Sequence, residues 1–248
     1  YNINEDFSQS KDLADVHPDK LVELQKLFNT EASKHNVYPL RDTSLRLSGD
    51  FRVPSALGKR KKMTYTTAHV RIPESSVINL KNASHKISAK VTIPTGGAQG
   101  VIACQGGNMS GWSLYLNDEG KATYHYNCYG QYLTTISADY ALGMGSHEIL
   151  VDYQHDGGFG SGGLATLYID GELIDSDRVD RTVPIMFSMS GETFDVGIDT
   201  GAPVGPYPHE YPFSGEIHEV VLERISRRDL KTKKKMRNGL KQAGLRSQ

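Results

Sequence analysis

Paired carboxylates on one strand are the first arrangement that could give this chain of 248 residues a chemical activity. Glycoside hydrolysis needs two carboxylates that face one groove. The nearest sequences are Glu216-Ile-His-Glu219 and Glu172-Leu-Ile-Asp-Ser-Asp177. On a strand, two residues that are three positions apart point to opposite faces, which separates Glu216 from Glu219. The second sequence crosses a turn. We therefore predict neither glycosidase nor lyase activity.

The histidines and serines show no spacing that predicts a zinc site or a nucleophile. The nine histidines include no ligand pair on one strand or helix, and we expect His85 and His125 to lie at a surface or interface. No Gly-x-Ser-x-Gly elbow is present. The segment Gly157–Gly163 lacks the Lys-Ser/Thr ending of a phosphate loop, so we expect it to connect two strands.

Two aspartates and two cysteines complete the set of candidate ligands. Asp195 and Asp199, with nearby carbonyls, offer oxygen ligands for a hard cation. We favour the alternative, a turn at Asp199-Thr-Gly201 whose own groups satisfy the carboxylate. Cys104 and Cys128 fall on one predicted meander, several residues apart along it, so we expect two free thiols. We therefore assign no metal ligand, catalytic residue or cofactor to this chain.

A group of aromatic residues is the candidate saccharide-binding feature, since aromatic faces stack on sugar rings. Trp112 lies among alternating apolar residues, however, so we expect it to pack in the core. The saccharide-binding residues, if the chain binds a saccharide, therefore stay unassigned. The group consists of Trp112, Tyr115, Tyr124, Tyr126 and Tyr129.

Alternation of apolar and polar residues indicates the fold class of residues 46–224. His85–Ile93 alternates cleanly, and Asn117–Gly120 fits a hairpin loop. About ten to twelve short strands without intervening helices predict a mainly β fold, an antiparallel jelly-roll sandwich. The other runs with strand character are Val101–Cys104, Trp112–Leu116, Ala122–Tyr126, His147–Tyr153, Leu164–Ile169 and Glu216–Leu222.

The two ends of the chain differ from this pattern. Residues 1–45 contain one amphipathic helix of roughly sixteen residues, which begins near Pro18 and precedes a short strand. Residues 225–248 form a basic tail: from Arg224 onward ten Lys/Arg stand against one acid, whereas the rest carries 18 basic and 28 acidic side chains. No aromatic residue interleaves with these charges, so we expect a solvated terminus and no nucleic-acid partner. No apolar run is long enough to span a membrane. The stripe of the helix is Leu21, Leu24, Leu27, Phe28 and Ala32.

Two segments of the sandwich resemble laminin-G-like, concanavalin-type domains. Leu167–Ile174 resembles their strand–Asp-Gly–strand hairpin, and Phe213–Leu222 resembles their final strand. Many such domains carry in that strand an Asp that helps to hold calcium. Here His218 stands at that position, so the resemblance does not imply a calcium site there.

A second resemblance covers nearly the whole chain except the basic tail. Tyr1–Ala14, Pro18, the Leu-rich helix and Val37–Leu40 resemble the end of a bacterial formylglycine-dependent arylsulfatase of the alkaline phosphatase superfamily. The family's Cys/Ser-x-Pro-x-Arg motif and Asp-Asp metal ligands are absent from this chain. The segments that resemble the region following the catalytic domain in long arylsulfatases are Gly100–Gly107, Gly111–Tyr115, Tyr126–Asn127 and Glu192–Gly201.

The resemblance implies a piece of a longer enzyme. Residue 1 is Tyr and no signal peptide follows it, so we expect a chain cut from a larger protein whose compartment is unknown. Its catalytic domain would hydrolyse sulfate esters with formylglycine and Ca²⁺ or Mg²⁺. We expect residues 1–45 to be the tail of that catalytic domain and residues 46–224 to be a non-catalytic accessory domain that contacts it. We also expect the chain to self-associate through the helix. The alternative is a carbohydrate-binding module that guides the parent to sulfated glycans.

Overall fold

A computed structural model describes residues 1–38, 40, 57–188 and 190–225. The chain divides into two compact units, residues 1–54 and 55–248, and each is described by itself. The predicted short strand after the helix does not form in residues 1–38 or at residue 40, and the rest of that segment lies outside the described residues. Residues 226–248 of the basic tail also lie outside the described residues.

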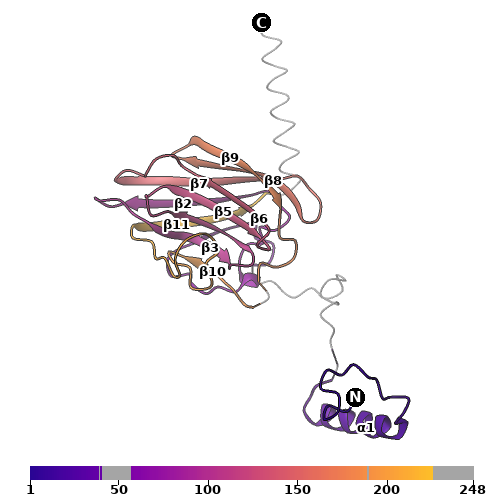
Figure 1. Cartoon of the computed structure of the whole chain (residues 1–248). Helices are drawn as coiled ribbons and strands as arrows, with labels where there is room; N and C mark the ends of the chain where they lie inside the picture. The colour runs from indigo at the N-terminus through magenta and orange to yellow at the C-terminus, as the bar shows by residue number, and fades with distance from the viewer. Residues whose placement is uncertain (39, 41–56, 189, 226–248) are drawn as a thin grey trace. The chain divides into compact units, whose positions relative to one another are not determined.

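The first unit contains the predicted helix, α1, which spans Pro18–Lys34 (Figure 1). Pro18 stands in the first turn, where its missing N–H costs nothing, and the acidic Asp19 and basic Lys34 complement the helix dipole. Of the helical residues, Ala32 alone is buried. The four large side chains of the predicted apolar stripe are about half exposed, from 39% at Leu21 to 54% at Leu27.

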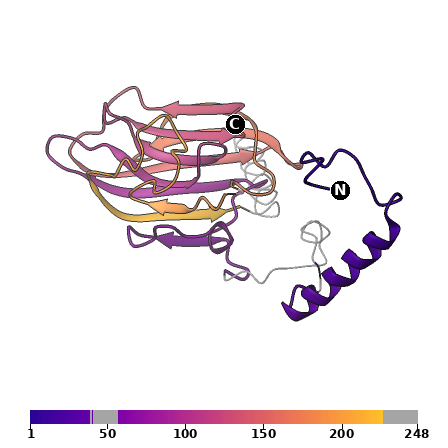
Figure 2. The same ribbon diagram turned by 60° about the horizontal axis from the view of Figure 1, so that its bottom comes forward.

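The second unit is a sandwich of two antiparallel sheets, which confirms the predicted fold class (Figures 1 and 2). A six-stranded sheet has the order β1-β11-β2-β7-β8-β9, and a five-stranded sheet has the order β10-β3-β4-β5-β6. The strands are β1 Lys62–Tyr65, β2 His85–Ile93, β3 Gly100–Gly106, β4 Gly111–Leu116, β5 Ala122–Cys128, β6 Tyr132–Ser137, β7 Gly145–His155, β8 Ser161–Ile169, β9 Glu172–Arg181, β10 Phe194–Val196 and β11 Glu216–Arg224.

The turns that the sequence indicates are present. The Asn117–Gly120 loop joins β4 to β5, and the Asn117 carboxamide accepts the Glu119 and Lys121 N–H groups. Asp170 and Gly171 join β8 to β9 with φ values of 52° and 87°. Positive φ at both central residues is the geometry of a tight hairpin turn, which Asp-Gly adopts readily.

The core lies between the two sheets. Alternate residues of β2 point into it, as its alternating burial shows. Trp112 is 1% exposed, and its indole N–H donates to the Gln105 Oε1 at 3.2 Å. Trp112 also lies against Phe194, with ring centroids 6.1 Å apart. The expected core position of Trp112 is therefore confirmed.

Candidate functional site

The first carboxylate pair departs from the geometry expected from the sequence. A β-bulge lies between Ile217 and Glu219 in the pairing of β11 with β2. Ile217 and Val220 both pack on the core, so Glu216 and Glu219 share the outer face, and the predicted opposite orientation is wrong. Glu219 nevertheless forms an ion pair with Lys90 at 2.8 Å. That pair lowers the pKa of Glu219, the reverse of what a general acid needs.

The bulged residue is His218, at the position where related domains carry a metal-binding Asp. Its Nε2 lies 2.7 Å from the Thr92 hydroxyl oxygen, and its Nδ1 lies 3.7 Å from the Glu216 carboxylate. The second carboxylate sequence lies on β9, an edge strand, where Glu172, Asp175 and Asp177 are exposed. The prediction that this second sequence crosses a turn is wrong, because all of Glu172–Asp177 lies within β9.

Most of the aromatic group is buried. Tyr115, Tyr124 and Tyr126 are at most 4% exposed, and with Trp112 they cannot present their faces to a sugar. The Tyr126 hydroxyl accepts the Val183 N–H at 3.0 Å. Tyr129, in the turn after β5, is the exposed member at 46%. The aromatic group is therefore not a stacking platform.

The two histidines predicted at a surface or interface are instead buried, His85 to 4% exposure and His125 to 5%. Each occupies a position where a polar partner is available: the His85 Nδ1 lies 2.9 Å from the Ala83 carbonyl oxygen, and the His125 Nδ1 lies 2.8 Å from the Thr135 hydroxyl oxygen. Burial lowers the pKa of both rings, to about 4 for His85. Both are therefore neutral at pH 7.

Asp195, Asp199 and Cys104 come together beneath the segment that follows β10. One ligand atom from each lies within 4.8 Å of the others, and all three residues are buried. The Asp199 carboxylate accepts the N–H groups of Gly201 and Val204. These bonds satisfy the Asp199 carboxylate within its own turn, which is the arrangement predicted for Asp199-Thr-Gly201.

Hydrogen-bond donors also surround Asp195, which accepts the Thr200 hydroxyl at 2.8 Å and the Arg71 backbone N–H. Burial and both carboxylates raise the pKa of the Cys104 thiol, which keeps it protonated. A cation would have to displace donors that are directed at both carboxylates, so the chemistry of this cluster fits loop closure better than metal binding. Cys104 and Cys128 are both free, as predicted.

The segment 198–212 covers the outer face of the five-stranded sheet. The Tyr207 hydroxyl lies 2.7 Å from the Asp199 Oδ2 and 3.0 Å from the Ser113 Oγ of β4. Tyr211 and Val204 pack with Val101, Cys104 and Tyr115 in a second apolar cluster outside the main core. The part of this face under the segment is consequently closed to a ligand.

An open pocket of about 560 Å³ lies at one end of the sandwich, and we call it the end pocket. It forms where the segment before β1, the residues before β2, the end of β7 and the end of β11 meet. Four of its residues are cationic, and none of its described lining residues is acidic. The lining consists of Gly58, Lys59, Arg60, Lys61, Asn82, Ala83, Ser84, His155, Gly157, Arg224 and Ile225.

Backbone bonds hold the walls of the end pocket. The Arg224 N–H donates to the Lys61 carbonyl oxygen at 2.7 Å, and the Ile225 N–H donates to the Ser84 carbonyl oxygen at 2.8 Å. The Ser84 hydroxyl oxygen accepts the His155 N–H at 3.0 Å. The ends of β1, β11, β2 and β7 are thereby tied together around the cavity.

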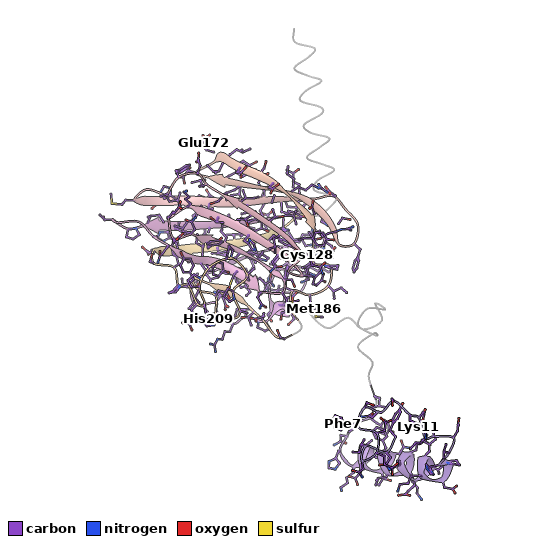
Figure 3. All side chains as sticks on the ribbon, in the orientation of Figure 1. Phe7, Lys11, Cys128, Glu172, Met186 and His209 are labelled. Carbon is purple, nitrogen blue, oxygen red and sulfur yellow. The ribbon has the colours of Figure 1, made fainter. Side chains whose placement is uncertain are left out.

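Asn82 ties the wall of the end pocket to two neighbouring loops. Its Oδ1 accepts the Gly160 N–H at 2.7 Å, and its amide donates to the Pro184 carbonyl oxygen at 2.6 Å. Gly160 belongs to the β7–β8 loop, so the segment Gly157–Gly163 does connect two strands as predicted. Figure 3 labels Glu172, the first residue of β9, at the upper edge of the sandwich, and Met186 and His209 at its lower edge.

The charge of Arg224, a lining residue of the end pocket, acts on two buried side chains, Lys81 and His85. Burial lowers the pKa of Lys81 to about 8, and the charge of Arg224 adds to this effect. The same arginine contributes to the lowered pKa of His85. The Lys81 ammonium pairs with Glu74 and lies 4.9 Å from the Phe187 ring centroid. Glu74 is thus engaged with Lys81 rather than with the pocket.

Sequence reasoning missed the end pocket because its walls come from four distant segments. The basic run Lys59–Lys62 was the available signal, but its meaning depends on the pairing that sets Lys62 opposite Glu223 and brings Arg224 alongside. Lysine or arginine at the start of an edge strand is otherwise an ordinary solvated residue.

Comparisons with known proteins bear on the architecture. No protein family and no curated protein matches the chain. Among solved structures, the chain is similar to the CBM40 of a Ruminococcus gnavus IT-sialidase bound to alpha2,3 sialyllactose. The identity is 18%, the match covers 60% of this chain and 81% of that one, and the TM-score is 0.42.

Two further similarities are of the same kind. Mouse laminin alpha1 domains LG4-5 share 14% identity, with 67% of this chain and 39% of that chain covered and a TM-score of 0.38. The Caenorhabditis elegans galectin LEC-6 shares 10% identity, with 68% and 99% covered and a TM-score of 0.38. None of these comparisons involves a sulfatase, and at such low similarity the function has to rest on this chain's own residues.

Proposed function

We propose that residues 57–225 form a non-catalytic carbohydrate-binding domain whose binding site is the end pocket. The observation that carries this proposal is the pocket itself: an open cavity of about 560 Å³ whose walls are tied together by backbone bonds. Cavities of roughly 300–1,000 Å³ hold small ligands. Asn82, Ser84 and the cationic side chains supply polar groups for sugar hydroxyls.

The composition of the end pocket supports binding without catalysis. Its described lining has no carboxylate, so it lacks the acid and the nucleophile or base of glycoside hydrolysis. The two remaining groups with catalytic potential are Ser84 and His155, and both have hydrogen-bond partners. The Ser84 Oγ accepts the backbone N–H of His155, and the His155 Nδ1 accepts the backbone N–H of Gly157 at 3.1 Å. The serine therefore has no base directed at it from this histidine nitrogen.

Hydrogen exchange on the full chain tests the location of the site. The chain is first screened against an array of neutral and acidic glycans, and the strongest binder is added in excess. Slowed exchange should be confined to residues 57–61, 82–84, 155–157 and 224–225, at the wall of the pocket. Protection centred on Trp112 and Tyr126, or on the face around Lys90, would contradict the proposal, as would the absence of any glycan binding.

A second candidate function rests on the exposed stripe of α1. We propose that the chain is the accessory region of a sulfatase and that this stripe contacts the parent's catalytic domain. Leu24 and Phe28 are 50% and 52% exposed, an arrangement that favours association. The coding sequence upstream of Tyr1 provides the test: a Cys/Ser-x-Pro-x-Arg motif in the same reading frame is expected. An upstream region without it would refute the sulfatase parent and, with it, the formylglycine and Ca²⁺ or Mg²⁺ that this parent would carry.

A further inference from the structure

We infer that the end pocket selects an acidic saccharide and holds the sugar's sulfate ester or carboxylate with Lys59, Arg60 and Arg224. This inference rests on the proposed carbohydrate-binding function and names the class of ligand. Its first support is composition: Lys59, Arg60 and Arg224 line one cavity, and no described lining residue is acidic. Like charges gathered in one cavity repel one another, and a bound anion relieves that repulsion.

The cations are held in place by the backbone beneath them. The turn that carries Lys59 is closed by the Arg60 N–H, which donates to the Leu57 carbonyl oxygen at 3.1 Å. Gly58 in this turn has φ +57°, a left-handed conformation that glycine adopts at little cost. Arg224 is anchored across the β1–β11 pair by its bond to the Lys61 carbonyl. Because the backbone beneath these cations is already held, binding of an anion has to order only their side chains.

Of the acidic residues close to the pocket in sequence, Glu223 lines a different depression, on the six-stranded sheet, and is paired in register with Lys62 of β1. Two other acidic residues have partners elsewhere. Asp156, between the lining residues His155 and Gly157, forms an ion pair with Arg178 on β9. Glu74 pairs with the buried Lys81. The pocket therefore presents net positive charge to a ligand.

An exposed aromatic side chain in the loop that also supplies the pocket residue Gly157 favours a sugar over a free anion. Phe159 is 74% exposed in the β7–β8 loop, and the next residue, Gly160, is bonded to the pocket residue Asn82. An aromatic face beside a cationic cavity suits a ligand with both a ring and an anionic group. Inorganic sulfate or phosphate would make no use of Phe159.

Calorimetric titration of the full chain tests this inference with paired probes. One pair is a sulfated galactan tetrasaccharide and its desulfated form, and the other is sialyllactose and lactose. The pairs distinguish a sulfate ester from a carboxylate as the source of the anion. Inorganic sulfate and a short oligonucleotide complete the set. The basic segment after residue 225 is the same in every variant, so its contribution cancels in each comparison.

The test variant is Lys59→Gln/Arg60→Gln, and the matched control is Lys86→Gln/Lys90→Gln. The control removes the same charge from the outer face of the six-stranded sheet, where Lys86 pairs with Asp152 and Lys90 pairs with Glu219. Exposed pairs of this kind contribute little to stability. Thermal melts of both variants establish that each is folded before binding is compared.

We expect an acidic probe to bind at least about tenfold more tightly than its neutral partner, because a hydrogen bond between a cation and an anionic group is stronger than one to a neutral hydroxyl. The test variant should lose about tenfold or more of that affinity, and the control should lose none. Phe159→Ala should weaken the acidic saccharide but not inorganic sulfate. Raising the salt concentration should weaken binding of the acidic probe.

Each contrary outcome has a separate meaning. Equal binding of an acidic and a neutral saccharide at the end pocket would overturn the inference and leave the carbohydrate-binding function standing. Binding of inorganic sulfate or of the oligonucleotide, without any saccharide, would overturn both. Acidic saccharide binding that both variants retain would place the ligand elsewhere and would also refute the inference.

Discussion

Replacing Trp112 with alanine tests whether the aromatic group belongs to the core or to a binding surface. Trp112 is the single tryptophan of the chain and is 1% exposed between the two sheets. Loss of a buried tryptophan costs about 3–5 kcal/mol through lost transfer energy and the remaining cavity. Here the substitution also leaves the Oε1 of Gln105, a residue that is 2% exposed, without its donor. We therefore expect the upper part of that range.

Trp112→Phe separates the two contributions. Phenylalanine keeps much of the packing against Phe194 and removes the N–H, so we expect about 1–3 kcal/mol for the unsatisfied Gln105 together with the smaller ring. Urea unfolding followed by far-ultraviolet circular dichroism measures both variants, because neither retains tryptophan fluorescence. An unchanged midpoint for Trp112→Ala, or a loss of glycan binding without a loss of stability, would refute the core position.

Four other predictions concern separate parts of the chain. Tyr207→Phe should lower the free energy of unfolding by about 1–3 kcal/mol, because the buried Asp199 loses its bond to the hydroxyl; an unaltered thermal melt would contradict this role. Leu24→Lys should reduce self-association in light scattering, and a wild-type chain that is already monomeric would refute association through the helix. Burial lowers the pKa of His147, but hydrogen bonds to Asp170 and to a backbone carbonyl outweigh it and raise the pKa above 6.5. The pair should therefore stabilise the fold fully below about pH 6.5 and lose that effect as the pH rises through the raised value; Asp170→Asn should lower the pKa in an NMR titration, and no change would exclude the pair as its cause. The chain alone should not hydrolyse an activated aryl sulfate with added Ca²⁺ or Mg²⁺, and turnover that survives repurification would reveal a catalytic site.

Local patterns predicted the regular parts of the sandwich. His85–Ile93 forms β2 with the bounds that its alternation indicates, because a strand with one buried face needs period-two apolar residues. Asp170-Gly171 forms the expected hairpin turn, since its conformational preference is local. Such elements are specified by neighbours in sequence, which a single sequence displays directly.

Features that depend on pairing between distant segments were not predictable in this way. The three-residue β10, Phe194–Val196, forms only because β3 lies beside it. The bulge at His218 places Glu216 and Glu219 on the same face of the sheet instead of on opposite faces, although the local sequence resembles a regular strand. The burial of His85 and His125 likewise follows from partners, Ala83 and Thr135, that the fold supplies.

The position of the candidate site follows from how the sandwich closes its other surfaces. The segment 198–212 covers part of the five-stranded sheet and ties Tyr207 to Ser113, whereas the outer face around Lys90 balances its own charges through Glu219. At the end of β11, which pairs there with the start of β2, Arg224 lies beside the basic run that precedes β1. No described acidic residue lines the same wall. Bringing cationic side chains together in one cavity costs electrostatic free energy, and binding of an anion offsets that cost. For this reason we propose the end pocket, rather than either sheet face, as the ligand-binding site of this fold.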